Sequence, residues 1–240
     1  MPSSSPESRD QAAPQLPGAA VEAAVWPDLL AGEDLKPSPK QERGHRARES
    51  ILRAAQALFA QNGYEATTVE EIAKAAGAAI GGFYRHFRSK RQALLVLMRR
   101  LLDEFDARRS TRQFNESARD ALERMRQDLQ TRWLHAGAYR AWREAVVRDP
   151  GLAALHAAME ALVTARIEGS LAIATTAPGL RQGVDLSTLA SLVNVVFWRM
   201  LDAAPSERHA IAETMMILVD HMLFEDAALD AERGGRGPQR

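Results

Sequence analysis

The stretch from Thr67 to Lys90, TTVEEIAKAAGAAIGGFYRHFRSK, constrains the fold more than any other part of the chain. Thr67, followed three residues later by Glu70, has the pattern of a capping box, which predicts that a helix starts there. Gly77 is placed to end this helix, since glycine adopts the left-handed conformation of a helix C-terminus at little cost. A second, very short helix is expected over residues 79–86, with two phenylalanines four residues apart on its buried side. Two helices joined by a glycine turn indicate a helix-turn-helix, whose second helix enters the major groove of DNA. A corner between two helices of an enzyme has the same local pattern.

Apolar residues recur at helical spacing through most of the remaining chain, and no alternating strand pattern is present. A first helix is expected over residues 46–62, with Gly63 ending it, and it completes a small three-helix unit. Ser89 is expected to cap a longer helix that leads into the second half of the chain. Further helices are expected around residues 122–133 and over residues 138–148, 150–175, 185–203 and 206–227. The last two are separated by Pro205 and Ser206 and should form an antiparallel pair.

These patterns predict an all-α fold divided into four parts. Residues 41–92 form an N-terminal three-helix helix-turn-helix domain, and residues 93–228 form a C-terminal helical domain. Residues 1–40 are rich in proline and serine and are expected to be a disordered extension, in which Trp26 belongs to the one apolar patch. Residues 229–240 are expected to be a disordered tail.

Positive charge gathers on the helix-turn-helix part of the chain, although the total of 31 Lys and Arg equals the total of 31 Asp and Glu. Residues 41–95 hold nine basic side chains against five acidic ones. Residues 1–40 hold three basic side chains against six acidic ones. A surface that binds DNA phosphates requires such a local excess of positive charge, so the distribution favours DNA binding.

Several classes of function are disfavoured by what the sequence lacks. The chain has no cysteine, which excludes disulfides and thiol catalysis and fits a reducing cytoplasm. Its six histidines show no metal-binding spacing, so neither a metal nor another cofactor is expected. No run of 18 apolar residues predicts a membrane span, and no signal peptide pattern is present. No catalytic motif is found either, so the protein is not expected to be an enzyme and no catalytic residue can be named.

Residues 46–95 resemble the DNA-binding segment of the TetR family of bacterial transcriptional regulators. The resemblance covers about a fifth of the chain and is specific, because many positions agree in one order without gaps. Beyond residue 95 only the helical layout and the size agree. The motifs that carry it are IL-AA-LF (Ile51, Leu52, Ala54, Ala55, Leu58 and Phe59), GY-A-TTV-EIA-AAG (Gly63 through Gly77) and G-FY-HF-SK (Gly81, Phe83, Tyr84, His86, Phe87, Ser89 and Lys90).

The resemblance implies a cytoplasmic repressor that binds a palindromic double-stranded DNA operator as a homodimer. It also implies that residues 93–228 form a ligand-binding and dimerisation domain, and that a small apolar or amphipathic effector releases the DNA. The last two helices are the expected dimer interface, since two helices per subunit make a four-helix bundle. The sequence departs from the family at Ala79 and Gly82, near which the family usually has hydroxyl side chains, and at Ile80, where a polar residue is common.

The expected DNA contacts gather on the recognition helix and its flanks. Tyr84 is expected to reach a phosphate through its hydroxyl, although a half-buried core tyrosine would give the same pattern. Lys90 opposes the dipole of the helix that follows Ser89, which favours a functional role such as a phosphate contact. Arg85 is placed either to read guanine or to lie in solvent. The full set of expected DNA-binding residues is Arg46, Thr67, Thr68, Ala79, Ile80, Gly81, Gly82, Tyr84, Arg85, His86, Ser89 and Lys90.

The second domain offers two further groups of candidate residues. An apolar effector pocket, with plain core packing as the alternative, is expected to involve Trp133, Tyr139, Trp142, Met159, Phe197 and Trp198. His135, Arg143 and Glu144 are candidate polar groups of this pocket. The expected dimer interface consists of Leu189, Val193, Val196, Met200, Met215, Leu218 and Met222.

Two alternatives remain open. One is a regulator controlled by a protein partner, which a collapsed core without a pocket would favour. The other is an enzyme with an incidental helix-turn-helix, which a cluster of histidine, aspartate and serine side chains in the pocket would indicate.

Overall fold

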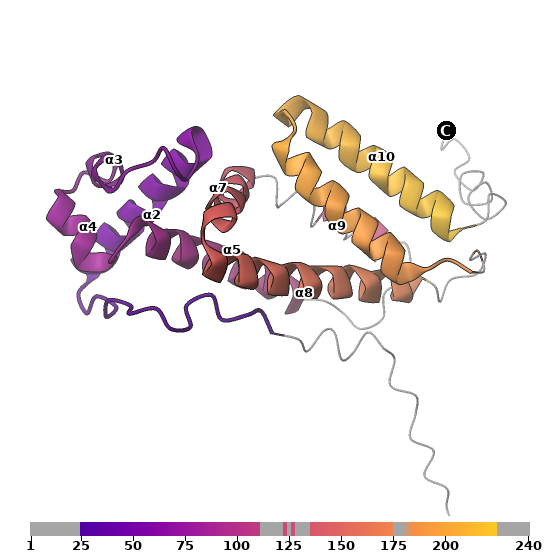
Figure 1. Cartoon of the computed structure of the whole chain (residues 1–240), viewed down its shortest axis with the longest axis horizontal. Coiled ribbons are helices and arrows are strands. Elements are labelled where there is room, and N and C mark those ends of the chain that lie inside the picture. The colour runs from indigo at the N-terminus through magenta and orange to yellow at the C-terminus, as the bar shows by residue number, and fades with distance from the viewer. Residues whose placement is uncertain are drawn as a thin grey trace, which may run out of the picture.

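The computed structural model describes residues 25–110, 122–123, 126–127, 135–174, 181 and 183–224, and the residues that it describes form helices and no strand. The predicted all-α fold is therefore confirmed. Figure 1 shows a small group of helices at one end of the molecule and a larger group at the other. The small group consists of α2 (Glu42–Asn62), α3 (Val69–Ala75) and α4 (Ile80–His86), and α5 (Lys90–Ser110) leads away from it. The larger group consists of α7 (Ala136–Arg148), α8 (Pro150–Ala174), α9 (Leu186–Asp202) and α10 (Pro205–Leu223).

The helix-turn-helix forms as predicted, but its first helix is capped one residue later than the sequence suggested. Thr68, not Thr67, is the N-cap of α3, and its hydroxyl accepts a hydrogen bond from the Glu71 amide at 3.2 Å. The Thr68 amide donates in return to the Glu71 carboxylate at 2.8 Å, which completes the capping box. Gly77 has a φ of 68° directly after α3, as expected of a glycine that ends a helix.

Helix α2 begins at Glu42, four residues earlier than predicted. The basic residues that precede Arg48 therefore lie on the first turns of a helix. Arg46 is largely exposed there and pairs with Glu42 across one turn at 3.0 Å. At its other end α2 packs against α7, where Gly137 meets Ala60. A Cβ atom on Gly137 would lie 2.1 Å from the Ala60 Cβ, so this close crossing requires glycine. Gly137 thus lies in the first turn of α7.

The second half of the chain is a stack in which α9 packs on α8 and α10 packs on α9. Figure 1 shows α9 and α10 as the expected antiparallel pair, with the turn at Pro205. Pro150 begins α8 as predicted. Asp185 caps α9, because its carboxylate accepts hydrogen bonds from the amides of Ser187 and Thr188 at 3.1 and 3.2 Å. The helix expected around residues 122–133 lies largely outside the described residues.

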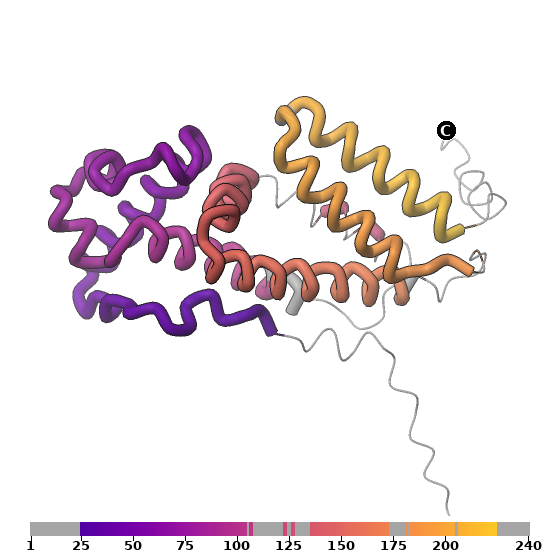
Figure 2. Tube along the Cα trace, viewed as in Figure 1, coloured from indigo at the N-terminus to yellow at the C-terminus, as the bar shows by residue number. Residues whose placement is uncertain are grey.

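Residues 25–40, which we call the N-terminal strap, are packed against the helices and are not a mobile extension. The tube in Figure 2 shows the strap running beneath the helices from the small group toward the larger one. Trp26 is 5% exposed and Leu29 is 1% exposed, so both belong to the hydrophobic core. The Arg166 guanidinium of α8 lies 4.2 Å from the centre of the Trp26 ring. The expected disorder therefore fails for this segment, while residues 1–24 and 229–240 lie outside the described residues.

Candidate DNA-binding surface and effector core

The recognition helix α4 buries one face and exposes the other. Phe83 and Phe87 are fully buried, with their ring centres 5.6 Å apart, and they anchor the helix to the core. Ile80 and Tyr84 are 45% and 46% exposed, and Arg85 is exposed as well. These three side chains are therefore available to a DNA groove.

The start of α4 lacks a side-chain cap, as the alanine at position 79 of the sequence suggested. Ala79 is its N-cap residue and makes no side-chain cap bond. Gly81 is exposed, whereas Gly82 is half-buried beside Ala78, whose Cβ atom would lie 3.3 Å from an added Cβ. Burial lowers the pKa of His86 below its usual 6.5, and the nearby positive charges of Arg48 and Arg85 lower it further.

The flanking candidates divide into exposed and buried side chains. Arg46, Thr68 and Ser89 are exposed, and the Ser89 hydroxyl accepts a hydrogen bond from the Gln92 amide at 3.1 Å in the first turn of α5. Thr67 is fully buried, and its hydroxyl donates to the Gly63 carbonyl at 2.7 Å. Thr67 is therefore not available to DNA in this conformation, contrary to expectation. Its role is to close the loop between α2 and α3.

Lys90 also has a different environment from the one expected. Its ammonium group donates to the carbonyl oxygens of Tyr64, Glu65 and Thr67 at 2.7, 3.2 and 2.9 Å. It also lies 4.4 Å from the centre of the Tyr64 ring. The ammonium group has three N–H donors, and this loop occupies all three. A cation in the first turn of α5 is thus explained by the loop that it holds, and the structure supplies no donor on Lys90 for a phosphate.

The loop of residues 63–67 is held from its other side by Glu144 of α7. The Glu144 carboxylate accepts hydrogen bonds from the amides of Tyr64 and Glu65 at 2.6 and 3.0 Å. Gly63 has a φ of 84°, and a Cβ atom there would lie 2.6 Å from Glu144 Oε2. The positive φ favours glycine at this position, and an added Cβ would push the Glu144 carboxylate aside. Glu144 was expected in a ligand pocket, but it connects the second domain to the helix-turn-helix.

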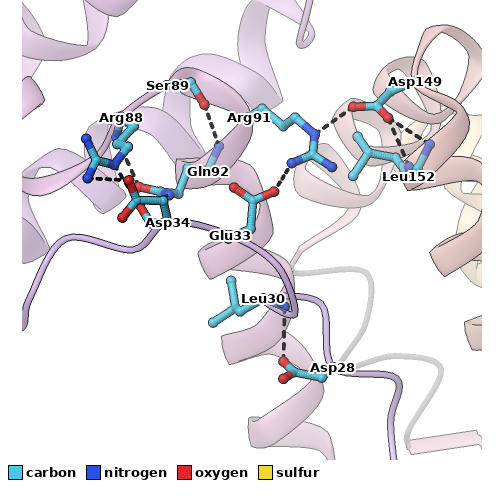
Figure 3. Close-up of polar contacts among 11 residues, drawn as sticks. Asp28, Leu30, Glu33, Asp34, Arg88, Ser89, Arg91, Gln92, Asp149 and Leu152 are labelled. Atoms are coloured by element: carbon cyan, nitrogen blue, oxygen red, sulfur yellow. Dashed lines mark hydrogen bonds and ion pairs between the residues drawn. The ribbon is translucent and has the colours of Figure 1, made fainter.

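A second connection joins the start of α5 to the start of α8 (Figure 3). Arg91 Nε donates to the Asp149 carboxylate at 2.6 Å, and another nitrogen of the same guanidinium bonds Glu33 of the strap. Asp149 also accepts from the amides of Gly151 and Leu152 at 2.9 and 3.1 Å, which caps α8. Nothing in the helical pattern of the sequence distinguished Arg91, Glu33 or Asp149, so the prediction from sequence missed this cluster.

The strap is also attached to the residues that start α5 (Figure 3). Arg88 Nε donates to the backbone oxygen of Asp34 at 2.8 Å, and the Arg88 guanidinium pairs with the Asp34 carboxylate. Gln92 is 2% exposed and donates to the same backbone oxygen at 3.2 Å. The acidic strap thus lies against the basic start of α5, which directly follows the recognition helix.

An aromatic cluster occupies the core between α7, α8 and α9. We use this name for Tyr139, Trp142, His156, Phe197 and Trp198. The Trp198 ring centre lies 6.0 Å from that of Tyr139, 5.4 Å from that of Phe197 and 5.0 Å from that of His156. Trp142 Nε1 lies 3.3 Å from His156 Nδ1 and donates a hydrogen bond to it. The structure therefore brings four of the expected pocket residues together.

Of the other candidate pocket residues, Arg143 lies beside the cluster, with its guanidinium 6.0 Å from the centre of the Trp198 ring. Met159 is buried on α8, and Trp133 lies outside the described residues. Arg143 pairs with Asp202 at 2.7 Å. His135 lies 3.3 Å from Gln56 of α2, so it faces the helix-turn-helix. Among the residues that the structure describes, no three histidine or acidic side chains gather as a metal site would require.

Helices α9 and α10 both carry large exposed apolar side chains, which we call the exposed apolar face. Its large side chains are between 44% and 65% exposed, and they are Leu192, Val195, Ile217, Leu218 and Met222. Only Leu218 and Met222 of this face were expected from the sequence. Val196 is half-buried, and four expected interface residues are buried within the subunit, namely Leu189, Val193, Met200 and Met215. Those four have no surface to offer a partner, because they pack into the core of their own subunit.

The helix-turn-helix and the whole fold both have relatives. Residues 51–96 match the family model described as bacterial regulatory proteins, tetR family. The chain is 32% identical to the HTH-type transcriptional regulator TcmR of Streptomyces glaucescens over 158 residues, which are 62% of this chain and 66% of that one. It is 41% identical to the HTH-type transcriptional repressor KstR2 of Mycobacterium tuberculosis over 78 residues, which are 32% of this chain and 38% of that one. The chain thus spans just under two thirds of the first relative and less than half of the second.

Solved structures share the fold across both halves of the chain. A transcriptional regulator from Saccharomonospora viridis in complex with choline has a TM-score of 0.63 at 19% identity, covering 75% of this chain and 98% of that one. The structure of KstR2 of Mycobacterium tuberculosis has a TM-score of 0.59 at 20% identity, covering 80% of this chain and all of that one. Within the described residues, no helix is long and apolar enough to span a bilayer.

Proposed function

Because this chain belongs to the TetR family of bacterial regulatory proteins, we propose that it is a transcriptional repressor that binds a palindromic DNA operator as a homodimer. It leaves the operator when a small apolar or amphipathic effector binds its second half. The observation that carries the proposal is the recognition helix. Helix α4 buries Phe83 and Phe87 and exposes Ile80, Tyr84 and Arg85, as a helix does that enters a major groove.

The exposed face of α9 and α10 supports the homodimer. A seven-residue recognition helix reaches only a few base pairs, so a two-fold dimer doubles the number of contacts. Packing this face against its own copy would bury Leu192, Val195, Ile217, Leu218 and Met222 in a four-helix bundle. Leu218 and Met222 of this proposed interface are shared with the set that the sequence pattern favoured, whereas Leu192, Val195 and Ile217 are additions to it.

The two connections between the halves suggest how an effector would act. The aromatic cluster lies on α7, α8 and α9. Helix α7 carries Glu144, and α8 is capped by the Asp149 that bonds Arg91. A ligand that moves α7 and α8 therefore moves the loop before α3 and the start of α5. Its effect on DNA binding is limited by its difference in affinity for the two conformations.

Selection of binding sequences from a random DNA library by the purified chain tests the proposal. We expect enrichment of two inverted half-sites whose centres are about one helical turn, or 34–36 Å, apart. Enrichment of a single half-site would contradict the dimer, and no enrichment at all would contradict sequence-specific DNA binding. If DNA binding holds but only a protein extract, and no small molecule, releases the DNA, the alternative of a protein partner replaces the small effector.

A further inference from the structure

Two buried polar atoms on α9 have no hydrogen-bond partner among the residues that the structure describes. They are Asn194 Oδ1 and Trp198 Nε1, and the two side chains are 6% and 9% exposed. Polar atoms that are withdrawn from water are nearly always hydrogen-bonded in proteins, because an unpaired one loses its bonds to water without replacement. The two residues are four positions apart, so they lie on the same face of the helix, one turn from each other.

The surroundings of this pair are aromatic on one side and polar on the other. Trp198 belongs to the aromatic cluster, with the His156 ring centre 5.0 Å away. Asn194 Nδ2 donates to Thr164 Oγ1 of α8 at 3.0 Å. A carboxamide and a hydroxyl can exchange donor and acceptor roles. In either orientation of the Asn194 amide, one of its polar atoms bonds Thr164 and the other is left without a partner.

The basic groups beside the cluster are paired or neutral. The Arg143 side chain bonds Asp202 at 2.7 Å. His156 Nδ1 accepts the Trp142 hydrogen bond, and His156 Nε2 lies 3.6 Å from Glu160 Oε1. Burial lowers the pKa of His156 below its usual 6.5, which keeps this ring neutral at pH 7. A ligand at this place therefore needs no charge of its own, but it needs an apolar body and a small polar group.

We propose that Asn194 and Trp198 are the polar end of the effector site, and that the effector is an uncharged, largely apolar molecule that carries a hydroxyl group. A hydroxyl accepts a hydrogen bond from the indole N–H and donates one to the amide oxygen, so it satisfies both kinds of unpaired atom. The apolar part of the molecule lies against the aromatic cluster. The inference rests on the proposed function, because it assigns the chemistry of the effector in that function.

Matched pairs of probe molecules test the hydroxyl preference directly. We would compare 2-naphthol with naphthalene and 1-octanol with octane, taking affinities from the concentration dependence of the thermal unfolding midpoint. The wild-type protein should bind at least one hydroxylated member about tenfold more tightly than its parent, as one additional buried hydrogen bond allows. Trp198→Phe removes the indole N–H together with the five-membered ring that carries it, and should reduce the ratio to about one to threefold.

Two further variants separate the polar contact from packing. Phe197→Leu is the matched control, because it trims the aromatic cluster and should weaken both members of a pair while leaving their ratio unchanged. The double variant Thr164→Val/Asn194→Leu replaces the Thr164 hydroxyl and the Asn194 amide, which bond each other, by apolar groups of similar shape. The unliganded double variant should therefore unfold at the same temperature as the wild-type protein or at a higher one. The same variant should lose the hydroxyl preference.

The possible outcomes decide the proposal. No preference for any hydroxylated probe in the wild-type protein, including no binding of any probe, overturns it. A preference that persists in both Trp198→Phe and the double variant overturns it too. The proposal is also overturned if a buried water molecule bonds both Asn194 Oδ1 and Trp198 Nε1 and is not displaced by the hydroxylated probe. DNA binding is measured on the same samples. A protein that binds selected DNA but shows no hydroxyl preference refutes this inference alone, whereas one that binds no DNA refutes the proposed function.

Discussion

Arg91 Nε donates a hydrogen bond to the Asp149 carboxylate at 2.6 Å, and this contact joins the first turn of the helix after the recognition helix to the start of α8. The two residues are 58 positions apart in the chain. Glu33 of the strap bonds the same guanidinium, so three segments meet at one side chain. The contact is partly buried, and it connects the two halves of the chain.

We expect Arg91→Gln to lower the free energy of unfolding by about 1–2 kcal/mol, because it removes two partly buried ion pairs. Asp149→Asn should cost a similar amount, and the double variant should cost clearly less than the sum of the two. Arg46→Gln is the matched control, because its pair with Glu42 is exposed and should contribute less than about 0.5 kcal/mol. Urea unfolding at pH 7 measures the four variants and the wild-type protein, and strict additivity would refute the coupling.

The same pair should make stability depend on pH at the acid side. Burial alone would raise the pKa of Asp149, but the hydrogen bonds from Arg91 and from the Leu152 amide outweigh it and hold the pKa below 3.8. The folded state therefore binds fewer protons than the unfolded state below about pH 4, so the stabilisation is present at higher pH and is lost as the pH falls through the folded pKa. The wild-type protein should lose more stability between pH 5 and pH 3 than Arg91→Gln does.

A second test concerns the loop between α2 and α3. Glu144→Ala should destabilise the fold by about 1–3 kcal/mol, because it leaves the amides of Tyr64 and Glu65 without their acceptor. Gly63→Ala should also destabilise it, through the positive φ and through a Cβ atom placed against the carboxylate. In the Glu144→Ala background the same glycine substitution should cost less, because only the backbone strain remains. Equal costs in the two backgrounds, measured by urea unfolding, would contradict the close approach.

The helix-turn-helix could be predicted from the sequence because its determinants are local. The glycine after α3, the capping pair and the two phenylalanines of α4 act within a few residues, so their spacing is visible in one segment. The cap itself was misplaced by one residue because Thr67 and Thr68 offer the same hydroxyl, and Glu70 and Glu71 the same carboxylate. Only the fold decides between them, by burying Thr67 completely.

The contacts between segments that are distant in the chain could not be predicted. Counting charges showed that residues 1–40 are acidic and that residues 41–95 are basic. Such a count does not show that Glu33 contacts Arg91 or that Asp34 contacts Arg88. Proline-rich composition predicted disorder, yet Trp26 and its neighbours bury enough apolar surface to dock the strap. Four of the expected interface residues are buried within the subunit for a related reason. Helical periodicity marks an apolar stripe, but α9 has apolar residues on two faces, and only packing shows which one the subunit itself covers.

The recognition helix gives a prediction about two kinds of DNA contact. Tyr84→Phe should weaken binding to selected and random DNA by a similar factor, because a phosphate contact carries no sequence information. Arg85→Ala should relax the preference at particular base pairs, as expected for a side chain that reads guanine. Fluorescence anisotropy with both DNA types and a repeated site selection measure these effects. An unchanged consensus for Arg85→Ala would exclude Arg85 as a reader of bases.

Lys90→Ala serves as the contrasting variant in that experiment. Since its ammonium group holds three carbonyl oxygens of the loop, the substitution should lower stability and should leave the slope of affinity against salt unchanged. A slope that is reduced by about one unit, at unchanged stability, would instead show that Lys90 binds a phosphate and that the loop contacts rearrange on DNA.

The dimer prediction has a matched pair of substitutions within the chain. Leu218→Glu and Val195→Glu place a charge in the exposed apolar face of α9 and α10, where the side chains are 58% and 65% exposed. Neither change disturbs the core, so the fold should survive while the subunits separate, because burying an unpaired carboxylate in an interface is costly. Val147→Glu is the control, since Val147 is 83% exposed on α7, outside this face. Light scattering should report monomers for the first two variants and a dimer for the third, and the monomers should bind an operator more weakly because each presents one recognition helix. Dimers in all three variants would place the interface elsewhere on the molecule.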